Sequence, residues 1–258
     1  MSTSGVLEHT VNPFNGITIE RNLLPSDADV FRDQLARSLA EWRKNGNLLV
    51  WLEVPIEKSE LVPVGVEEGF DFHHSGEGYL MMTLRLVENA LIPGYATHYI
   101  GAGGVVINDK NEILVVVERH RRSKHPSYKL PGGALQSGEH LEDCVVREIS
   151  EETGIETIFE SLVCFRHWHG YRYEKSDIYF VCRLRPRSRE ITIQDDEIES
   201  CQWMPVDEYL ASEFVHSFNR RIVQVALNGS GVVPTEIDGY TDPKKHEVFM
   251  PEGIQFDI

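Results

Sequence analysis

The sequence has little positive charge for its length. Its 258 residues include 25 lysines and arginines against 41 aspartates and glutamates, which gives a formal net charge of −16 at pH 7. Binding to the phosphate backbone of a nucleic acid needs a basic surface. The imbalance therefore argues against a nucleic acid as the main partner. A small anionic substrate can still bind where a divalent cation screens the charge.

Cysteine is also scarce, and the four cysteines are dispersed. They form no Cys-x-x-Cys pair and no Cys/His cluster with the spacing of zinc ligands, which indicates reduced thiols rather than disulfides or a zinc site. The sequence lacks an apolar run near the roughly 18 residues of a membrane span. Its start also lacks the basic region and apolar stretch of a secretory signal. We therefore expect a soluble cytoplasmic or nuclear protein that does not bind membranes.

The pattern of apolar residues changes near Pro93. A chain of this length has room for one large domain or two smaller ones. Helices and strands alternate before Pro93, and strands dominate after it until one strong helix. We expect three parts: an α/β domain over residues 1–95, a larger domain over residues 96–228, and an irregular tail over residues 229–258.

Apolar periodicity predicts helices and strands in both domains. In the first domain we expect strands at residues 16–21, 48–54, 70–73 and 79–87, and helices at 26–45 and 58–69. In the second we expect strands at residues 99–107, 113–119, 128–130, 157–168, 178–184 and 200–204, and helices at 140–153 and 212–227. Ser26 should cap the first helix, and the last helix should bury Phe214, Phe218, Ile222 and Val225.

One segment holds acidic residues in a pattern that packing does not explain. Residues 133–155 read GALQSGEHLEDCVVREISEETGI. At about 100° per residue, Glu148, Glu151 and Glu152 lie in one arc of the helix, at the border of its apolar face. Like charges at this spacing repel, and partial burial increases the cost. Mg²⁺ or Mn²⁺ would compensate for it, because these cations bind oxygen ligands. The alternative is a glutamate-rich surface helix.

The same segment resembles the Nudix box, the signature motif of the Nudix hydrolases. It matches the motif at each defining position: Gly133, Glu139, Arg147, Glu148, Ile149, Glu151, Glu152, Gly154 and Ile155. Further segments resemble the Nudix subgroup with an N-terminal pre-Nudix domain: residues 49–55 (LVWLEVP), 68–74 (EGFDFHH), 175–186 (KSDIYFVCRLRP) and 202–205 (QWMP).

This subgroup includes the animal protein encoded antisense to basic fibroblast growth factor and the plant ADP-ribose/NADH pyrophosphatases. The resemblance covers roughly residues 12–212. It implies an α+β fold, in which a Nudix α/β/α sandwich with a mixed sheet follows a smaller α/β domain. It also suggests a homodimer.

The resemblance implies a metal site on the helix. Glu148 and Glu152 would be the principal ligands of Mg²⁺ or Mn²⁺. Glu151 and the carbonyl of Gly132 would add to them, and a glycine there lets the backbone approach the cation closely. A metal-bound water would then attack one phosphorus of a diphosphate in line.

The remaining catalytic roles follow from the same resemblance. Arg147 would orient the glutamates, and Glu139 would stabilise the loop before the helix through hydrogen bonds. The general base stays open, because members of the family differ. Glu151 is the first candidate, and Glu197 or Glu199 is the second. The alternative for Glu197 is a solvated residue in an acidic loop.

Residues 166–173 are candidates for substrate binding. Trp168 or Tyr171 would stack on the base, and Arg166 would bind the distal phosphate. Three arginines before the box compete for the phosphate: Arg119, Arg121 and Arg122. The alternative is a strand end followed by a polar turn.

We expect hydrolysis of a diphosphate bond in a small nucleotide such as ADP-ribose or NADH. One alternative is a binding or regulatory module that keeps the fold and contacts a protein partner. Another is a diadenosine polyphosphate hydrolase, which Tyr171 suggests. The acidic balance argues against mRNA decapping.

Overall fold

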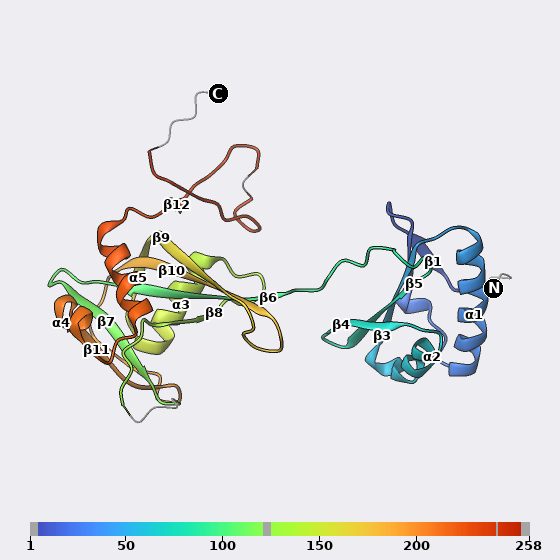
Figure 1. Cartoon of the computed structure of the whole chain (residues 1–258), viewed down its shortest axis with the longest axis horizontal. Coiled ribbons are helices and arrows are strands. Elements are labelled where there is room, and N and C mark those ends of the chain that lie inside the picture. The colour runs from blue at the N-terminus through green and yellow to red at the C-terminus, as the bar shows by residue number, and fades with distance from the viewer. Residues whose placement is uncertain (1–4, 121–124, 241, 254–258) are drawn as a thin grey trace. The chain divides into compact units, whose positions relative to one another are not determined.

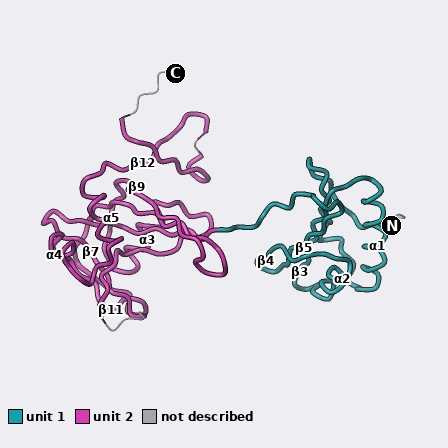
Figure 2. The backbone as a smooth tube through the Cα atoms, in the orientation of Figure 1, with its two compact units in different colours: residues 1–97 teal, residues 98–258 magenta. Residues whose placement is uncertain are grey.

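The chain folds into two compact units. The computed structural model describes residues 5–120, 125–240 and 242–253. Its contacts separate Met1–Thr97 from His98–Ile258 (Figure 2). Arg121 and Arg122 lie outside the described residues. Among the residues that the structure does describe, no helix combines the length and apolar character needed to cross a membrane.

The first unit contains a five-stranded mixed sheet in the order β1-β2-β3-β5-β4 (Figure 1). Its strands are β1 (His9–Val11), β2 (Gly16–Ile19), β3 (Leu49–Pro55), β4 (Asp71–Gly76) and β5 (Tyr79–Arg85). Only β2 and β3 are parallel among these neighbours. Its helical segments are η1 (Arg21–Leu23), α1 (Ala28–Lys44), η2 (Ile56–Leu61) and α2 (Val62–Glu67).

Two details of these helices correct the sequence predictions. The cap of α1 is Asp27 and not Ser26, because the Asp27 side chain accepts hydrogen bonds from the N–H groups of Asp29 and Val30. The helix predicted at residues 58–69 is a 3₁₀ helix followed by α2. Proline in the first turn of α2 suits a helix start, since its missing N–H has no partner there.

The second unit contains a four-stranded sheet in the order β8-β6-β10-β9 and a two-stranded sheet of β11 and β7. Its strands are β6 (His98–Val106), β7 (Glu112–Glu118), β8 (Gly132–Ala134), β9 (Thr157–Trp168), β10 (Ser176–Pro186) and β11 (Ile198–Pro205). β6 and β10 are parallel, and the other neighbours are antiparallel. β9 has the predicted bounds. The strand predicted at residues 128–130 is only a bridge between Lys129 and Val116, because Pro131 cannot donate to a ladder.

Three helices pack on these sheets: α3 (Leu141–Thr153), α4 (Val206–Ala211) and α5 (Ser217–Asn228). The prediction of one helix from residue 212 is therefore wrong. The His216 side chain accepts a hydrogen bond from the N–H of Phe218 and caps α5, so this helix begins only at residue 217. Ile222 is buried as predicted, but Phe214 and Val225 are 37% and 38% exposed.

The sheets of this unit supply side chains to two hydrophobic cores. Val105 and Val181 belong to the core that includes residues of α4 and α5, whereas their neighbours Val106 and Cys182 belong to the core that includes α3. Successive residues of a strand point to opposite faces. The helices therefore cover both faces, which is the predicted α/β/α sandwich with a mixed sheet.

The segment after α5 is mostly irregular and packs against the second unit. It contains two short antiparallel strands, β12 (Val233–Pro234) and β13 (Phe249–Met250). Val232 forms a bridge with Leu162 of β9, and Phe249 packs against the core of α3. The segment therefore belongs to the second unit.

Candidate active site

Helix α3 carries most of the predicted site. Its side chains at Val145 and Ile149 are fully buried against the sheet. Gly154 ends it with φ +72°, a left-handed conformation that glycine adopts without strain. Glu148, whose side chain is 15% exposed, and Glu152, which is 9% exposed, lie at the border of the buried face. The helical spacing thus places both carboxylates where the sequence predicted.

Arg147 binds three of the predicted glutamates at once. Its Nε and Nη2 donate to the Glu139 carboxylate at 2.6 and 3.0 Å. Its Nη1 donates to Glu148 at 2.8 Å and to Glu151 at 3.0 Å. These contacts raise the pKa of Arg147, with the hydrogen bond to Glu139 as the largest cause. The guanidinium thereby holds the carboxylates of Glu148 and Glu151 together.

Glu139 connects the preceding loop to this cluster. Its Oε2 accepts a hydrogen bond from the backbone N–H of Gln136 at 3.0 Å, in addition to the bonds from Arg147. The hydrogen bond from Arg147 is the largest cause of the lowered pKa of Glu139. Glu139 is therefore an ionised side chain that ties the loop to the helix.

The glycine turn before the box brings the backbone against the glutamates. The N–H of Gly132 donates to Glu152 Oε2 at 2.9 Å. A Cβ on Gly133 would lie 2.4 Å from Glu148 Oε2, and one on Gly132 would lie 2.2 Å from the carbonyl oxygen of Ala102. The space that a side chain would occupy at residue 133 is thus filled by the Glu148 carboxylate.

The electrostatic environment of Glu152 is unfavourable for a carboxylate. Burial raises the pKa of Glu152 from 4.5 to about 7, although the hydrogen bond from Gly132 opposes the rise. The negative charges of Glu148, Glu118 and Glu197 raise it further. Burial also raises the pKa of Glu148. Buried carboxylates so close together are what a divalent cation would stabilise.

Glu118, at the end of β7, is a site residue that sequence reasoning missed. It is the strand partner of Ile198 in β11, which directly follows Glu197. Both acidic residues contribute to the raised pKa of Glu152, and Glu118 also pairs with Lys129 Nζ at 2.6 Å. No local pattern predicts that β7 pairs with β11. The only signal was a charged residue at the end of an apolar strand.

The carboxylates suit a hard cation chemically but do not meet at one point. Within residues 5–120, 125–240 and 242–253, no three His, Cys, Asp or Glu side chains are close enough together to hold a metal ion. Glu148 and Glu151 are bound to Arg147 instead, and Glu152 is bound to the backbone of Gly132. The predicted ligand set therefore requires these side chains to turn towards a cation.

Arg166 has partners within the protein. Its Nη2 donates to the buried carboxylate of Asp177 at 2.5 Å. Its guanidinium carbon lies 5.3, 5.5 and 5.6 Å from the ring centres of Trp168, Tyr179 and Phe218. This arrangement leaves less of the guanidinium for a phosphate than the sequence suggested.

The other predicted substrate residues lie at or just beyond the ends of two strands, β9 and β7. Trp168 is the last residue of β9, and Tyr171 lies in the loop that follows. Their ring centres are 5.2 Å apart, and Trp168 is 47% exposed. The ring of Tyr99 lies 5.9 Å from that of Tyr171. Arg119 is exposed beside β11, where its N–H donates to the carbonyl of Glu197 at 2.7 Å. Arg119 Nη2 also donates to the carbonyl of Ile198 at 3.4 Å. The aromatic pair and Arg119 therefore lie at the ends of different strands.

Tyr179 is a second residue that the sequence did not single out. Its ring lies 5.5 Å from the guanidinium carbon of Arg166. Burial raises the pKa of Tyr179, and the charge of Glu152 adds to the effect. A Cβ on Gly103 would lie 1.8 Å from its hydroxyl, so the glycine in β6 provides the space for this ring.

Two family models match the chain. The model described as Nudix hydrolase domain matches residues 7–86, and that described as NUDIX domain matches residues 97–225. Nudix hydrolase 8 of Arabidopsis thaliana is 38% identical, over 82% of this chain and 59% of its own length. Nudix hydrolase 2 of the same plant is 40% identical, over 75% of this chain and 70% of its own. Nucleoside diphosphate-linked moiety X motif 6 of Homo sapiens is 32% identical, over 86% of this chain and 72% of its own length.

These matches confirm the pre-Nudix domain that the sequence predicted and the similarity to both plant and animal proteins. The chain spans less than two thirds of Nudix hydrolase 8 but more than two thirds of the other two relatives. Together with the box and its geometry, the family models and the relatives show that this chain belongs to the Nudix hydrolase family.

Proposed function

We propose that this protein hydrolyses a diphosphate bond in a nucleoside diphosphate-linked small molecule such as ADP-ribose or NADH, with Mg²⁺ or Mn²⁺ as cofactor. One observation carries the proposal. A single guanidinium, that of Arg147, holds Glu148 and Glu151 beside the buried Glu152. Burial raises the pKa of Glu148 and of Glu152, so keeping both ionised costs stability that a bound cation would offset. Membership of the family supports the same reaction.

Four groups would hold the cation: the carboxylates of Glu148, Glu151 and Glu152 and the carbonyl of Gly132. When bound, it would neutralise diphosphate charge and lower the pKa of the attacking water. Arg147 would keep the carboxylates aligned, because its planar group donates in several fixed directions. The absence of a side chain at the glycine turn leaves room for Glu148 beside the backbone.

Glu151 is our first candidate for the general base. Its side chain is 52% exposed, so water can reach it. Glu197 is the second candidate, because it is exposed and its charge acts on Glu152. A base must lie within hydrogen-bond reach of the water that it deprotonates.

For the substrate, we propose that Trp168 and Tyr171 stack on the base. Trp168 is 47% exposed and Tyr171 is partly exposed, and an aromatic ligand can stack on rings of this kind. We favour Arg119 over Arg166 for the phosphate, because Arg166 is ion-paired with Asp177 at 2.5 Å, whereas the hydrogen bond from Arg119 to the Ile198 carbonyl is long, at 3.4 Å. The partly exposed Tyr171 also suits a diadenosine polyphosphate, which is the second substrate class to test.

The test is release of AMP from purified protein with Mg²⁺ or Mn²⁺. The substrates would be ADP-ribose, NADH, FAD, coenzyme A and diadenosine polyphosphates. We expect metal-dependent cleavage that Glu152→Gln abolishes. Glu156→Gln is the matched control, because Glu156 is exposed and lies just beyond α3. If the folded, metal-loaded protein hydrolysed none of these substrates, a binding or regulatory module would become the better explanation. The homodimer and the choice of metal stay predictions.

A further inference from the structure

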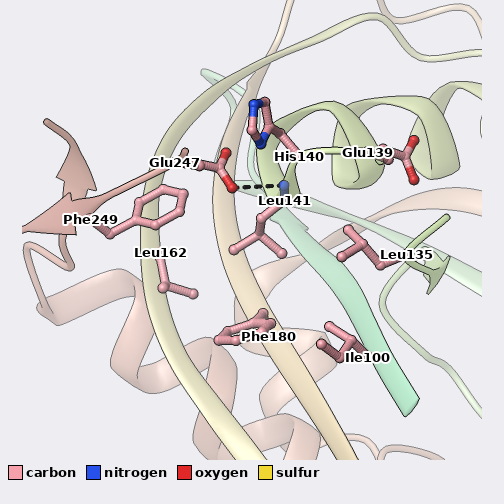
Figure 3. A pocket seen from close by; sticks show the side chains of 9 residues that line it. All are labelled: Ile100, Leu135, Glu139, His140, Leu141, Leu162, Phe180, Glu247 and Phe249. Atoms are coloured by element: carbon pink, nitrogen blue, oxygen red, sulfur yellow. Dashed lines mark hydrogen bonds between the residues drawn. The ribbon is translucent and has the colours of Figure 1, made fainter. Parts of the chain in front are cut away.

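The first turn of α3 is capped by a residue from the far end of the unit. The residue before α3, His140, makes no side-chain cap. Instead, the Glu247 carboxylate accepts hydrogen bonds from the N–H of Leu141 at 2.8 Å and of Glu142 at 3.0 Å. Figure 3 shows the contact with Leu141 as a dashed line. A carboxylate is favourable there, because the free N–H groups give a helix start partial positive charge.

Two further contacts fix the same segment. His140 Nε2 lies 2.9 Å from the carbonyl oxygen of Pro243. The ring of Phe249 lies 5.8 Å from that of Phe159 and packs against the core to which α3 contributes. Residues 243–249 therefore contact both the start of α3 and the sheet beneath it. Figure 3 shows Glu247 and Phe249 on one side of a hollow and Glu139 on another.

The contact lies next to the cluster that organises the candidate active site. Glu139 directly precedes His140, and its carboxylate holds Nε and Nη2 of Arg147. Arg147 in turn holds Glu148 and Glu151. A shift at the start of α3 would therefore move Glu139 and, through Arg147, the carboxylates proposed to bind the cation.

We propose that Glu247 is a positioning residue for the α3 carboxylates. Residues 242–250 are then part of the catalytic domain, although they lie beyond the NUDIX match that ends at residue 225. The role in hydrolysis rests on the proposed function. The role in holding α3 and its cation site does not depend on turnover and can be measured separately.

The first measurement is hydrogen exchange at the amides of Leu141 and Glu142 in the full-length chain. Glu247→Ala should speed exchange about fivefold, the factor that a typical N-cap contributes. Glu247→Gln keeps one acceptor oxygen and should lie between this variant and the wild type. Glu252→Gln is the matched control, because Glu252 is exposed in the same segment. It should exchange like the wild type.

The second measurement is calorimetric binding of Mn²⁺ to the same four proteins. Glu247→Ala should weaken binding roughly three- to tenfold, somewhat less than the ~10–100-fold that loss of a direct partner of a metal ligand causes. The Mn²⁺ concentration for half-maximal hydrolysis should rise by the same factor, while KM for the nucleotide changes less than about twofold. A merely structural cap would not produce this selective effect.

The outcomes test the positioning role of Glu247 and the proposed hydrolysis separately. Unchanged exchange, or faster exchange with unchanged Mn²⁺ affinity, would overturn the positioning role. If no variant hydrolysed any nucleotide but exchange and Mn²⁺ binding changed as expected, the positioning role would stand and the proposed function would fail. Circular dichroism checks folding, and Glu247→Gln supplies the comparison if the alanine variant does not fold.

Discussion

Nε of Arg147 lies 2.6 Å from Oε1 of Glu139, a residue eight positions earlier in the chain. This ion pair joins the loop before α3 to the helix itself. Because the same guanidinium also donates to Glu148 and Glu151, the loop and the candidate metal ligands form one connected unit. The following predictions test this unit and its surroundings.

Arg147→Lys should impair hydrolysis although it keeps the charge. A lysine ammonium cannot reproduce the fixed donor directions of the guanidinium. We expect kcat/KM to fall by about one to two orders of magnitude and the free energy of unfolding to fall by about 1–2 kcal/mol. Steady-state kinetics and denaturant titration measure the two effects. Arg185→Lys is the control, because the Arg185 side chain is 61% exposed. Equal losses in both variants would contradict the prediction.

The stability of the metal-free protein should depend on pH through Glu152. Its pKa in the folded protein, about 7, lies above the ordinary 4.5, so between these values the folded protein holds a proton that the unfolded chain has released. Stability should therefore fall as the pH rises from about 4.5 to 7, by at most about 3 kcal/mol. Glu152→Gln removes this loss and should be the more stable protein at about pH 8 in chelator.

Denaturant titration of wild type and Glu152→Gln across this pH range measures the difference. Added Mg²⁺ should stabilise the wild type preferentially, because a cation binds the ionised carboxylate. Parallel pH profiles for the two proteins would show that Glu152 does not titrate in this way. Glu156→Gln should follow the wild type.

The two candidates for the general base differ in their expected kinetics. Glu151→Gln should lower kcat by about 10²–10⁴, with little change in stability since the side chain is half-exposed. Glu197→Gln should reduce kcat less. Glu197 lies on a neighbouring loop and influences the site through the effect of its charge on Glu152. Comparison of kcat at saturating substrate and metal distinguishes them. A larger loss in Glu197→Gln would reverse the assignment.

Gly133→Ala should displace the Glu148 carboxylate. The added Cβ would lie 2.4 Å from Glu148 Oε2, so that side chain must move. We expect metal affinity to fall by about tenfold or more, which Mn²⁺ calorimetry measures. Gly94→Ala is the matched control, since a Cβ there would meet no atom of the described residues within 4 Å. Normal Mn²⁺ affinity in Gly133→Ala would count against Glu148 as a ligand.

The part of the site on α3 could be predicted because a single helix carries it. Spacing along the helix determines which side chains share a face, so the positions of Glu148 and Glu152 followed from the sequence. The bounds of β9 were predicted for a similar reason, since its composition and length are typical of a strand.

The remaining contacts depend on how distant segments pair. Glu118 and Glu197, whose charges both act on Glu152, come together because β7 pairs with β11, and Arg166 meets Asp177 through the pairing of β9 with β10. The break between α4 and α5 depends on a histidine cap, which is less common than Ser, Thr, Asp or Asn. No periodicity in the sequence encodes any of these contacts.

The cap of α3 also sets an order of events during synthesis. Leu141 and Glu247 are 106 residues apart, so α3 leaves the ribosome long before its cap does. Until residues 243–249 emerge, the first amides of the helix are bonded to water and its acidic face lacks its final support. A nascent chain therefore carries the complete box before the proposed cation site has the support of its cap. Mg²⁺ or Mn²⁺ would therefore bind the growing chain more weakly than the completed unit, by roughly the three- to tenfold expected for Glu247→Ala.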